Sequence, residues 1–155
     1  MLSESGPVAP RNLGEPDCLV VVAAVVVQRE HLLVVSKQAA PDVFYLPGGK
    51  PEPGEEPLDA LARELAEELG VEPVEPRFLD EVEAPAALEK VPMKMTVFQT
   101  DIDRAPQPAA ELAGLRWVTG HESVQLAPAV RDHVLPLLRS RGLIAPGPVP
   151  SQTRS

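Results

Sequence analysis

The segment 56–69 constrains the fold of this chain more than any other part of its sequence. Its apolar residues recur every three or four positions and predict an amphipathic helix. The predicted apolar stripe consists of Leu58, Leu61, Ala62, Leu65 and Leu69. Gly70 follows directly, where a helix commonly ends. Glu64, Glu67 and Glu68 stand at i, i+3 and i+4, so their carboxylates share one helix face beside the stripe. Like charges this close disfavour a helix unless a cation lies among them.

The loop before this helix has the composition of a ligand-binding turn. Gly48, Gly49 and Gly54 allow the backbone to turn tightly and to approach a ligand or metal closely. Glu55 lies near the expected helix start, where a negative charge suits the helix dipole. Arg63 has a planar guanidinium that can clamp Glu55 and so hold the loop against the helix.

Read together, these residues follow one spacing between Gly49 and Val71. It is Gly, five residues, Glu, seven residues, Arg-Glu-Leu, one residue, Glu-Glu, Leu, Gly-Val. A run of charges alone is ordinarily a solvated helix face. A match to the full pattern by chance is on the order of one in a million for a chain of this length. The segment resembles the Nudix box, with every fixed position matched.

The resemblance implies roles for individual residues. The carbonyl of Gly48 and the carboxylates of Glu64, Glu67 and Glu68 would bind Mg²⁺ or Mn²⁺, and Lys50 would lie near the substrate phosphates. Hard divalent cations prefer such oxygen ligands.

Other residues of the box would support this site or take part in the reaction. Arg63 and Glu55 would be mainly architectural, with Gly49 and Gly70 as structural support. Either Glu67 or the loop residue Glu111 would serve as general base. Glu83 and Glu89 are weaker candidates for the same role.

The remaining patterns predict an α/β protein with a Nudix-type α/β/α sandwich around a mixed β-sheet. A buried strand is expected at Leu19–Val27, and a second helix at Pro128–Arg139, which Pro136 should kink or shorten. Further strands are expected at Leu32–Ser36, Phe44–Leu46, Arg77–Val82, Met93–Thr100 and Leu115–Val118. The domain would span 18–143, between a flexible arm at 1–17 and a flexible tail at 144–155.

Composition and charge restrict the class of partner. Hydrophobic residues make up 44% of the 155 positions and charged residues 24%, as in globular proteins. A net charge of −9 argues against binding of polymeric nucleic acid. The apolar run at Leu19–Val27 is too short to span a membrane. The single cysteine fits a reducing compartment, so we expect a cytoplasmic protein. A homodimer is left open.

The expected substrate is a small nucleotide, but the box itself does not select one. The run Leu46-Pro47-Gly48-Gly49-Lys50 resembles MutT-like members. This resemblance favours a (deoxy)nucleoside triphosphate cut to monophosphate and pyrophosphate. ADP-ribose or another nucleoside-diphosphate sugar is an alternative, because Pro85 stands 14 positions after Val71 and nearly matches a proline of ADP-ribose hydrolases. A catalytically silent Nudix fold, used as a ligand sensor or interaction module, is a further alternative.

Aromatic residues that could stack on a nucleotide base are few. The sequence holds one Trp, one Tyr and three Phe. Phe44, Tyr45 and Phe78 are the candidates for base stacking. The competing interpretation is that all three belong to the core.

Overall fold

The structure, a computed structural model, describes residues 18–86 and 91–144. Its first sheet has four strands in the order β5-β1-β7-β6. Strand β1 (Leu19–Val25) lies in the middle and pairs in parallel with β7 (Pro92–Ile102). At the edges, β5 (Gly48–Gly49) pairs with β1 and β6 (Pro73–Pro85) pairs with β7, both in antiparallel fashion. The sheet is therefore mixed, and its parallel pair of β1 and β7 joins segments far apart in the sequence.

A second sheet begins where the first strand ends. The predicted strand 19–27 divides at Val26, and the chain continues into β2 and then β3 as an antiparallel hairpin. Arg29 and Glu30 form the turn with φ of 52° and 65°, a left-handed geometry that suits two-residue hairpins. The sheet consists of β2 (Val27–Gln28), β3 (His31–Lys37), β4 (Ala40–Tyr45) and β9 (Gln125–Leu126) in that order, with β8 (Leu112–Val118) on β3.

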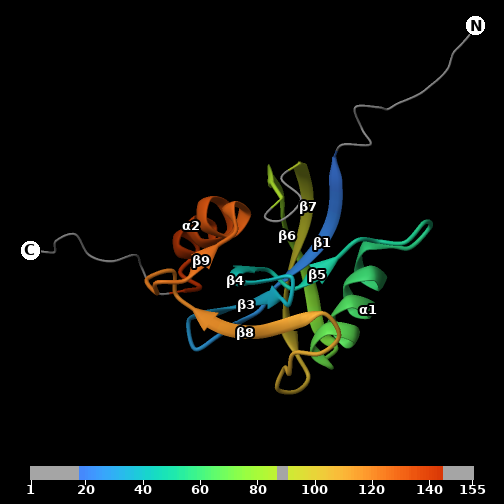
Figure 1. Ribbon diagram of the computed structural model, residues 1–155, viewed down its shortest axis with the longest axis horizontal. Helices are drawn as coiled ribbons and strands as arrows, with labels where there is room; N and C mark the ends of the chain where they lie inside the picture. The colour runs from blue at the N-terminus through green and yellow to red at the C-terminus, as the bar shows by residue number, and fades with distance from the viewer. Residues whose placement is uncertain (1–17, 87–90, 145–155) are drawn as a thin grey trace, which may run out of the picture.

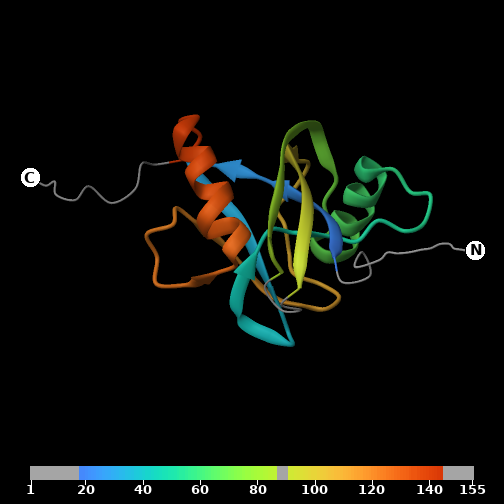
Figure 2. The ribbon, with the colours of Figure 1, turned by 90° about the horizontal axis from the view of Figure 1, so that it is seen from above.

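The strands lie between two helical layers. Helix α1 (Pro57–Leu69) and the helical pair η2 (Val130–Val134) and α2 (Leu135–Ser140) lie on opposite sides of them (Figure 1, Figure 2). Side chains alternate along β1 and β3: one set packs with α1 and the other with η2 and α2. The prediction of an α/β/α sandwich is confirmed, although the strands form two sheets instead of one.

Helix α1 has nearly the predicted bounds. It begins at Pro57, after Glu56, and ends at Leu69, before Gly70, whose φ of 68° is left-handed. Leu58 is 41% exposed, so its place in the buried stripe was wrong. The stripe begins instead with Ala60 and continues through Leu61. Glu68 is buried on the same side of the helix as Leu61, Leu65 and Leu69.

The second helix differs from its prediction around Pro136. The helix is not shortened there, since α2 continues to Ser140, but it widens just before Pro136 into the π-helical turn η2, in which the Leu135 N–H donates to the carbonyl of Val130. Proline has no N–H, and its ring clashes with the carbonyl four residues earlier. A wider turn just before Pro136 relieves that clash. This turn also carries Val130 toward the first sheet.

The predicted limits of the domain lie close to the ends of the described residues. The predicted arm at 1–17 and the tail beyond residue 144 lie outside the described residues. Ile144, which we assign to the tail, is buried in the core beside α2. Leu19–Val27 is less buried than expected at its start, where Val20 is 54% exposed. No helix in the described part of the chain is long and apolar enough to cross a membrane.

Candidate active site

Arg63 fastens the glycine-rich loop to helix α1. Its Nε and Nη2 donate to the two carboxylate oxygens of Glu55, each at 2.9 Å, and Nη2 also donates to the carbonyl of Lys50 at 3.1 Å. The hydrogen bonds from Arg63, followed by one from the Glu52 N–H, lower the pKa of Glu55 to about 2. The predicted clamp between Arg63 and Glu55 is confirmed. It fixes the path of the loop between β5 and α1.

We expect Arg63→Ala and Glu55→Ala each to lower turnover about tenfold or more, because a misplaced loop displaces the neighbouring carboxylates. The double variant should lose less than the sum of both losses, since either change breaks the same clamp. A double-mutant cycle on kcat and on the melting temperature measures this coupling. The exposed pair Arg131 and Asp132, joined at 2.9 Å, is the matched control, and its cycle should show no effect on kcat. Full additivity at Arg63 and Glu55 would contradict the clamp.

The three glutamates of α1 occupy different environments. Glu68 is 4% exposed and accepts a long hydrogen bond from the Gly48 N–H at 3.4 Å. Glu64 is half-buried and accepts from Arg63 Nη1 at 3.2 Å. The Glu67 side chain is 57% exposed and lies 3.7 Å from the same Arg63 nitrogen. The helix therefore offers one buried, one half-buried and one exposed carboxylate along a single face.

Burial makes this face electrostatically unfavourable without a cation. Burial, and next the negative charge of Glu64, raise the pKa of Glu68 to about 7. Burial also raises the pKa of Glu64, although Arg63 opposes this shift. Two neighbouring carboxylates thus resist ionisation. A divalent cation would relieve this strain, and oxygen donors of this kind fit Mg²⁺ or Mn²⁺.

A complete metal site is not assembled in this arrangement. Within residues 18–86 and 91–144, no three His, Cys, Asp or Glu side chains gather closely enough to hold a metal ion. Arg63 Nη1 lies 3.2 Å from the Glu64 carboxylate and 3.7 Å from that of Glu67, so it engages two of the three helix carboxylates. The three glutamates supply the oxygen ligands that a hard cation needs. In this structure the carboxylates of Glu64 and Glu67 contact Arg63 instead.

Strand β5 requires glycine at both of its positions. A Cβ on Gly48 would lie 2.1 Å from the Val22 carbonyl oxygen, and the φ of Gly48 is 149°. A Cβ on Gly49 would lie 2.5 Å from the carboxylate of Glu64. The two glycines therefore let the backbone pass between β1 and α1. They confirm that close approach, and not only turning, explains the glycine pair.

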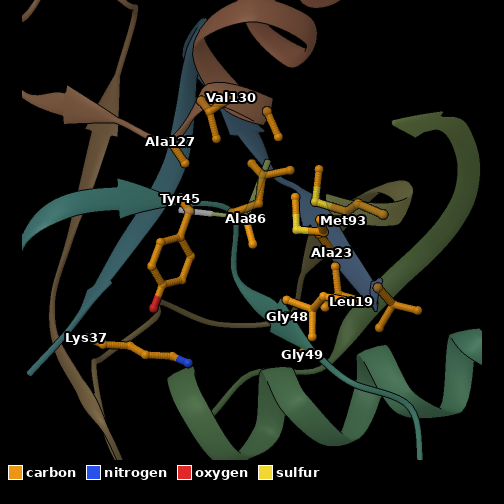
Figure 3. Close-up of a pocket in the computed structure, with 15 residues that line it drawn as sticks. Leu19, Ala23, Lys37, Tyr45, Gly48, Gly49, Ala86, Met93, Ala127 and Val130 are labelled. Atoms are coloured by element: carbon orange, nitrogen blue, oxygen red, sulfur yellow. The ribbon is translucent and has the colours of Figure 1, made fainter. Parts of the chain in front are cut away.

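A cavity adjoins this pair of glycines. Gly48 and Gly49 form part of its wall, together with two polar side chains, Lys37 and Tyr45 (Figure 3). The other lining residues are apolar: Leu19, Val21, Val22, Ala23, Leu46, Ala86, Met93, Met95, Ala127, Ala129 and Val130. Because Gly48 contacts Glu68 and Gly49 lies against Glu64, the cavity borders the carboxylate face of α1.

Lys37 and Glu111 complete the charged surroundings of this face. Lys37 Nζ lies 3.5 Å from Glu111 Oε2. The charge of Glu111 raises the pKa values of Glu64 and Glu68, and that of Lys37 lowers the pKa of Glu68. The structure thus brings the predicted Glu111 toward the helix carboxylates. Lys37 was not identified from the sequence; its one signal is a cationic residue at the end of an otherwise buried strand.

The remaining predicted residues lie less centrally. Lys50 is exposed in the loop after β5 and does not line the cavity. Of the aromatic candidates, Tyr45 lines the cavity, whereas Phe44 and Phe78 do not. Phe78 is 64% exposed on β6, so the core interpretation was wrong for this residue. Phe44 packs partly buried against the core, with Arg116 over its ring at 5.9 Å.

The two weaker candidates for the general base have different outcomes. Glu83 is exposed on β6, in register with Lys94. Glu89 lies outside the described residues.

Comparisons with known proteins agree with this geometry. Residues 19–138 match the model of the NUDIX domain. The putative 8-oxo-dGTP diphosphatase 2 of Mycobacterium tuberculosis is 33% identical over 126 residues, which cover 78% of this chain and 89% of that protein.

Two other proteins match over different shares of their length. The human 8-oxo-dGDP phosphatase NUDT18 is 38% identical over 79 residues, which cover 50% of this chain but only 24% of the human protein. This chain therefore spans about a quarter of that relative. The solution structure of the E. coli ORF135 protein superposes with a TM-score of 0.62 at 27% identity, over 85% of this chain and 94% of that one.

Proposed function

This chain belongs to the Nudix family, whose hydrolases act on phosphoric anhydride bonds of nucleotides, and on that premise we propose a specific reaction. The enzyme uses Mg²⁺ or Mn²⁺ to hydrolyse a (deoxy)nucleoside triphosphate to the monophosphate and pyrophosphate. One observation carries the proposal: Gly48 and Gly49 join the carboxylate face of α1 to the cavity. A nucleotide bound in the cavity would place its phosphates beside Glu64 and Glu68.

The proposed division of labour follows from the charges around the site. Glu64, Glu67 and Glu68 would hold the divalent cation, with the carbonyl of Gly48. When bound, the cation neutralises the polyphosphate and lowers the pKa of water, as divalent ions do in other hydrolases. Lys37, whose side chain lines the cavity, would neutralise a phosphate oxygen. Lys50 and Arg63 would lie at the outer edge of the phosphate region.

A general base completes this proposal. Glu111 is held by Lys37 in the present arrangement. When Lys37 turns to the substrate, Glu111 becomes able to accept a proton from the attacking water. Glu67, which is exposed on the same face, is the alternative base. The water oxygen bonds to the α-phosphorus. The bond from that phosphorus to the oxygen that bridges it to the β-phosphorus breaks, so pyrophosphate leaves.

The substrate class rests on the relatives as well as on the cavity. The mycobacterial relative is named for 8-oxo-dGTP and the human one for 8-oxo-dGDP, both nucleotides with a chain of phosphates. A cavity that has Lys37 in its wall and borders the carboxylates of α1, where a cation would bind, fits such a molecule better than a neutral ligand. A triphosphate substrate supplies pyrophosphate as its leaving group.

A product assay with Mg²⁺ tests this function. Deoxy- and ribonucleoside triphosphates, 8-oxo-dGTP, ADP-ribose and a diadenosine polyphosphate are supplied separately, and the products are separated by anion-exchange chromatography. Pyrophosphate from a triphosphate supports the proposal. If AMP and ribose phosphate from ADP-ribose are the dominant products, the proposal is contradicted. The ADP-ribose alternative suggested by the position of Pro85 is then favoured. Binding of nucleotides without any hydrolysis would indicate a ligand sensor.

We expect Lys37→Ala to raise KM for the triphosphate about tenfold or more, because one charge-assisted phosphate contact is lost. Glu111→Gln should instead lower kcat, by about 100-fold, if Glu111 is the base. Steady-state kinetics separates the two effects. Lys94→Ala is the matched control, since Lys94 is exposed on β7 and does not line the cavity. Unchanged KM in Lys37→Ala would remove this residue from the phosphate site, and unchanged kcat in Glu111→Gln would leave Glu67 as the base.

A further inference from the structure

The polar and apolar parts of the cavity are separated in space. Among its described lining residues, only Lys37 and Tyr45 carry polar side-chain atoms. Figure 3 shows the Lys37 amino group and the Tyr45 hydroxyl pointing toward α1, while Ala86, Met93 and Val130 lie away from that end. A substrate whose phosphates lie beside α1 would place its remaining group against these apolar side chains.

Much of the main chain around this apolar part is already paired. The Ala86 N–H donates to the Val91 carbonyl at 2.8 Å, and the Ala127 N–H donates to the Phe44 carbonyl at 2.8 Å. The Val130 N–H donates to Ala127 at 3.0 Å. Strands β1 and β7 bond to each other along the whole length of β1. The N–H groups of Ala86, Ala127 and Val130 are therefore not available as donors for the edge of a nucleotide base.

A site that reads a base edge places amide, carboxylate or guanidinium groups opposite that edge. Such a site rejects an analogue that lacks one hydrogen-bonding group, because its own polar groups then remain unpaired. Stacking and apolar contact distinguish bases much less, since every base has an apolar face. Met93 and Met95 favour recognition by apolar contact, because methionine is unbranched, flexible and able to adapt to ligands of different shape.

Building on the proposed hydrolysis of nucleoside triphosphates, we infer that this cavity accepts the base through apolar contact and shape, without hydrogen-bond readout of its edge by the described side chains. The enzyme therefore cleaves triphosphates of different bases with similar efficiency. It does not separate an oxidised guanine from guanine strongly, although two of its relatives are named for 8-oxoguanine nucleotides. The apolar wall of Leu19, Val21, Met93 and Met95 sets the size of the accepted group.

A panel of triphosphates with one altered edge group tests this inference on the unmodified protein. We expect kcat/KM for dATP, dGTP, dCTP, dTTP, dITP and 8-oxo-dGTP to agree within about tenfold. The pair dGTP and dITP isolates the 2-amino group, and the pair dGTP and 8-oxo-dGTP isolates the changes at N7 and C8. A ratio above tenfold in either pair overturns the inference while leaving the proposed function intact. If no triphosphate is hydrolysed, the proposed function fails and the inference fails with it.

Variants of the apolar wall give a second readout. Met93→Ala should raise KM about five- to tenfold, and by the same factor for every base, because it removes a contact that all bases share. Met93→Leu should restore the KM of the unmodified protein. Val20→Ala is the matched control: Val20 lies on β1 between Leu19 and Val21 but is 54% exposed and outside the cavity, so its KM should not change. A loss confined to one base in Met93→Ala, with its melting temperature retained, would overturn the inference.

Discussion

Glu68→Gln is expected to lower turnover at least about 100-fold while stabilising the metal-free protein at pH 8. The loss of turnover follows from removing a proposed metal ligand next to the cavity. The gain in stability follows from burial, because Glu68 is 4% exposed and an ionised carboxylate is unfavourable there. Turnover is measured with saturating Mg²⁺, and stability by urea unfolding with a chelator present.

The stability gain should depend on pH with a definite sign. The folded pKa of Glu68 is raised to about 7, above its unfolded value of 4.5. The folded protein therefore binds the proton more tightly, and the free energy of unfolding falls as pH rises between these two values. Above pH 7 the ionised carboxylate destabilises the fold by up to about 3 kcal/mol. The advantage of the glutamine variant should be largest at pH 8 and should shrink markedly by pH 5.

Two variants on the same helix serve as controls. Glu67→Gln should lose turnover as well but should gain no stability, because the Glu67 side chain is 57% exposed. Asp59→Asn removes a charge from the exposed first turn and should leave turnover unchanged. Normal turnover in Glu68→Gln would contradict the site. A stability gain that does not change with pH would contradict the part assigned to burial.

Gly48→Ala is expected to destabilise the protein by about 3 kcal/mol or more and to abolish activity in what remains folded. The new Cβ would meet backbone atoms, the Val22 carbonyl oxygen at 2.1 Å and the Ala23 Cα at 2.8 Å, and these cannot rotate away. Its φ of 149° is also unfavourable for any residue with a side chain. Chemical denaturation compared with the unmodified chain measures the effect.

Gly114→Ala provides the matched control in strand β8. A Cβ there would meet no atom within 4 Å, and its φ is not in the left-handed region. Its stability should therefore change little. Gly49→Ala should fall between the two, because its Cβ would meet the carboxylate of Glu64, a side chain that can move. Equal stability of Gly48→Ala and Gly114→Ala would show that β5 is not packed as closely as described.

Helix α1 and its clamp could be predicted from the sequence because their signals are local. The apolar period, Pro57 at the first turn and Gly70 at the end all lie within one segment. The pairing of Arg63 with Glu55 joins residues only eight positions apart, one in the loop and one in the helix that follows it. The Nudix resemblance rests on the same segment. These features depend little on how the rest of the chain folds.

The cavity could not be predicted in the same way, since its walls come from strands and turns that are distant in sequence. Lys37 enters from the end of β3, and no local pattern relates it to Glu68. The aromatic candidates, in contrast, are constrained by the geometry of their own strand. Adjacent residues of a strand point to opposite faces, so Phe44 and Tyr45 could not both line one cavity.

The parallel pairing of β1 with β7 has a consequence for the order in which the molecule folds. Leu19 pairs with Met93 and Val25 with Gln99. Forming this ladder therefore closes a long loop that contains all the residues between the two strands. Contacts of such long sequence separation form slowly, whereas a helix such as α1 forms from neighbouring residues. We therefore expect the acidic face of α1 to form before the cavity beside it is complete. An incompletely folded chain would carry the acidic helix but would have no place to seat a nucleotide.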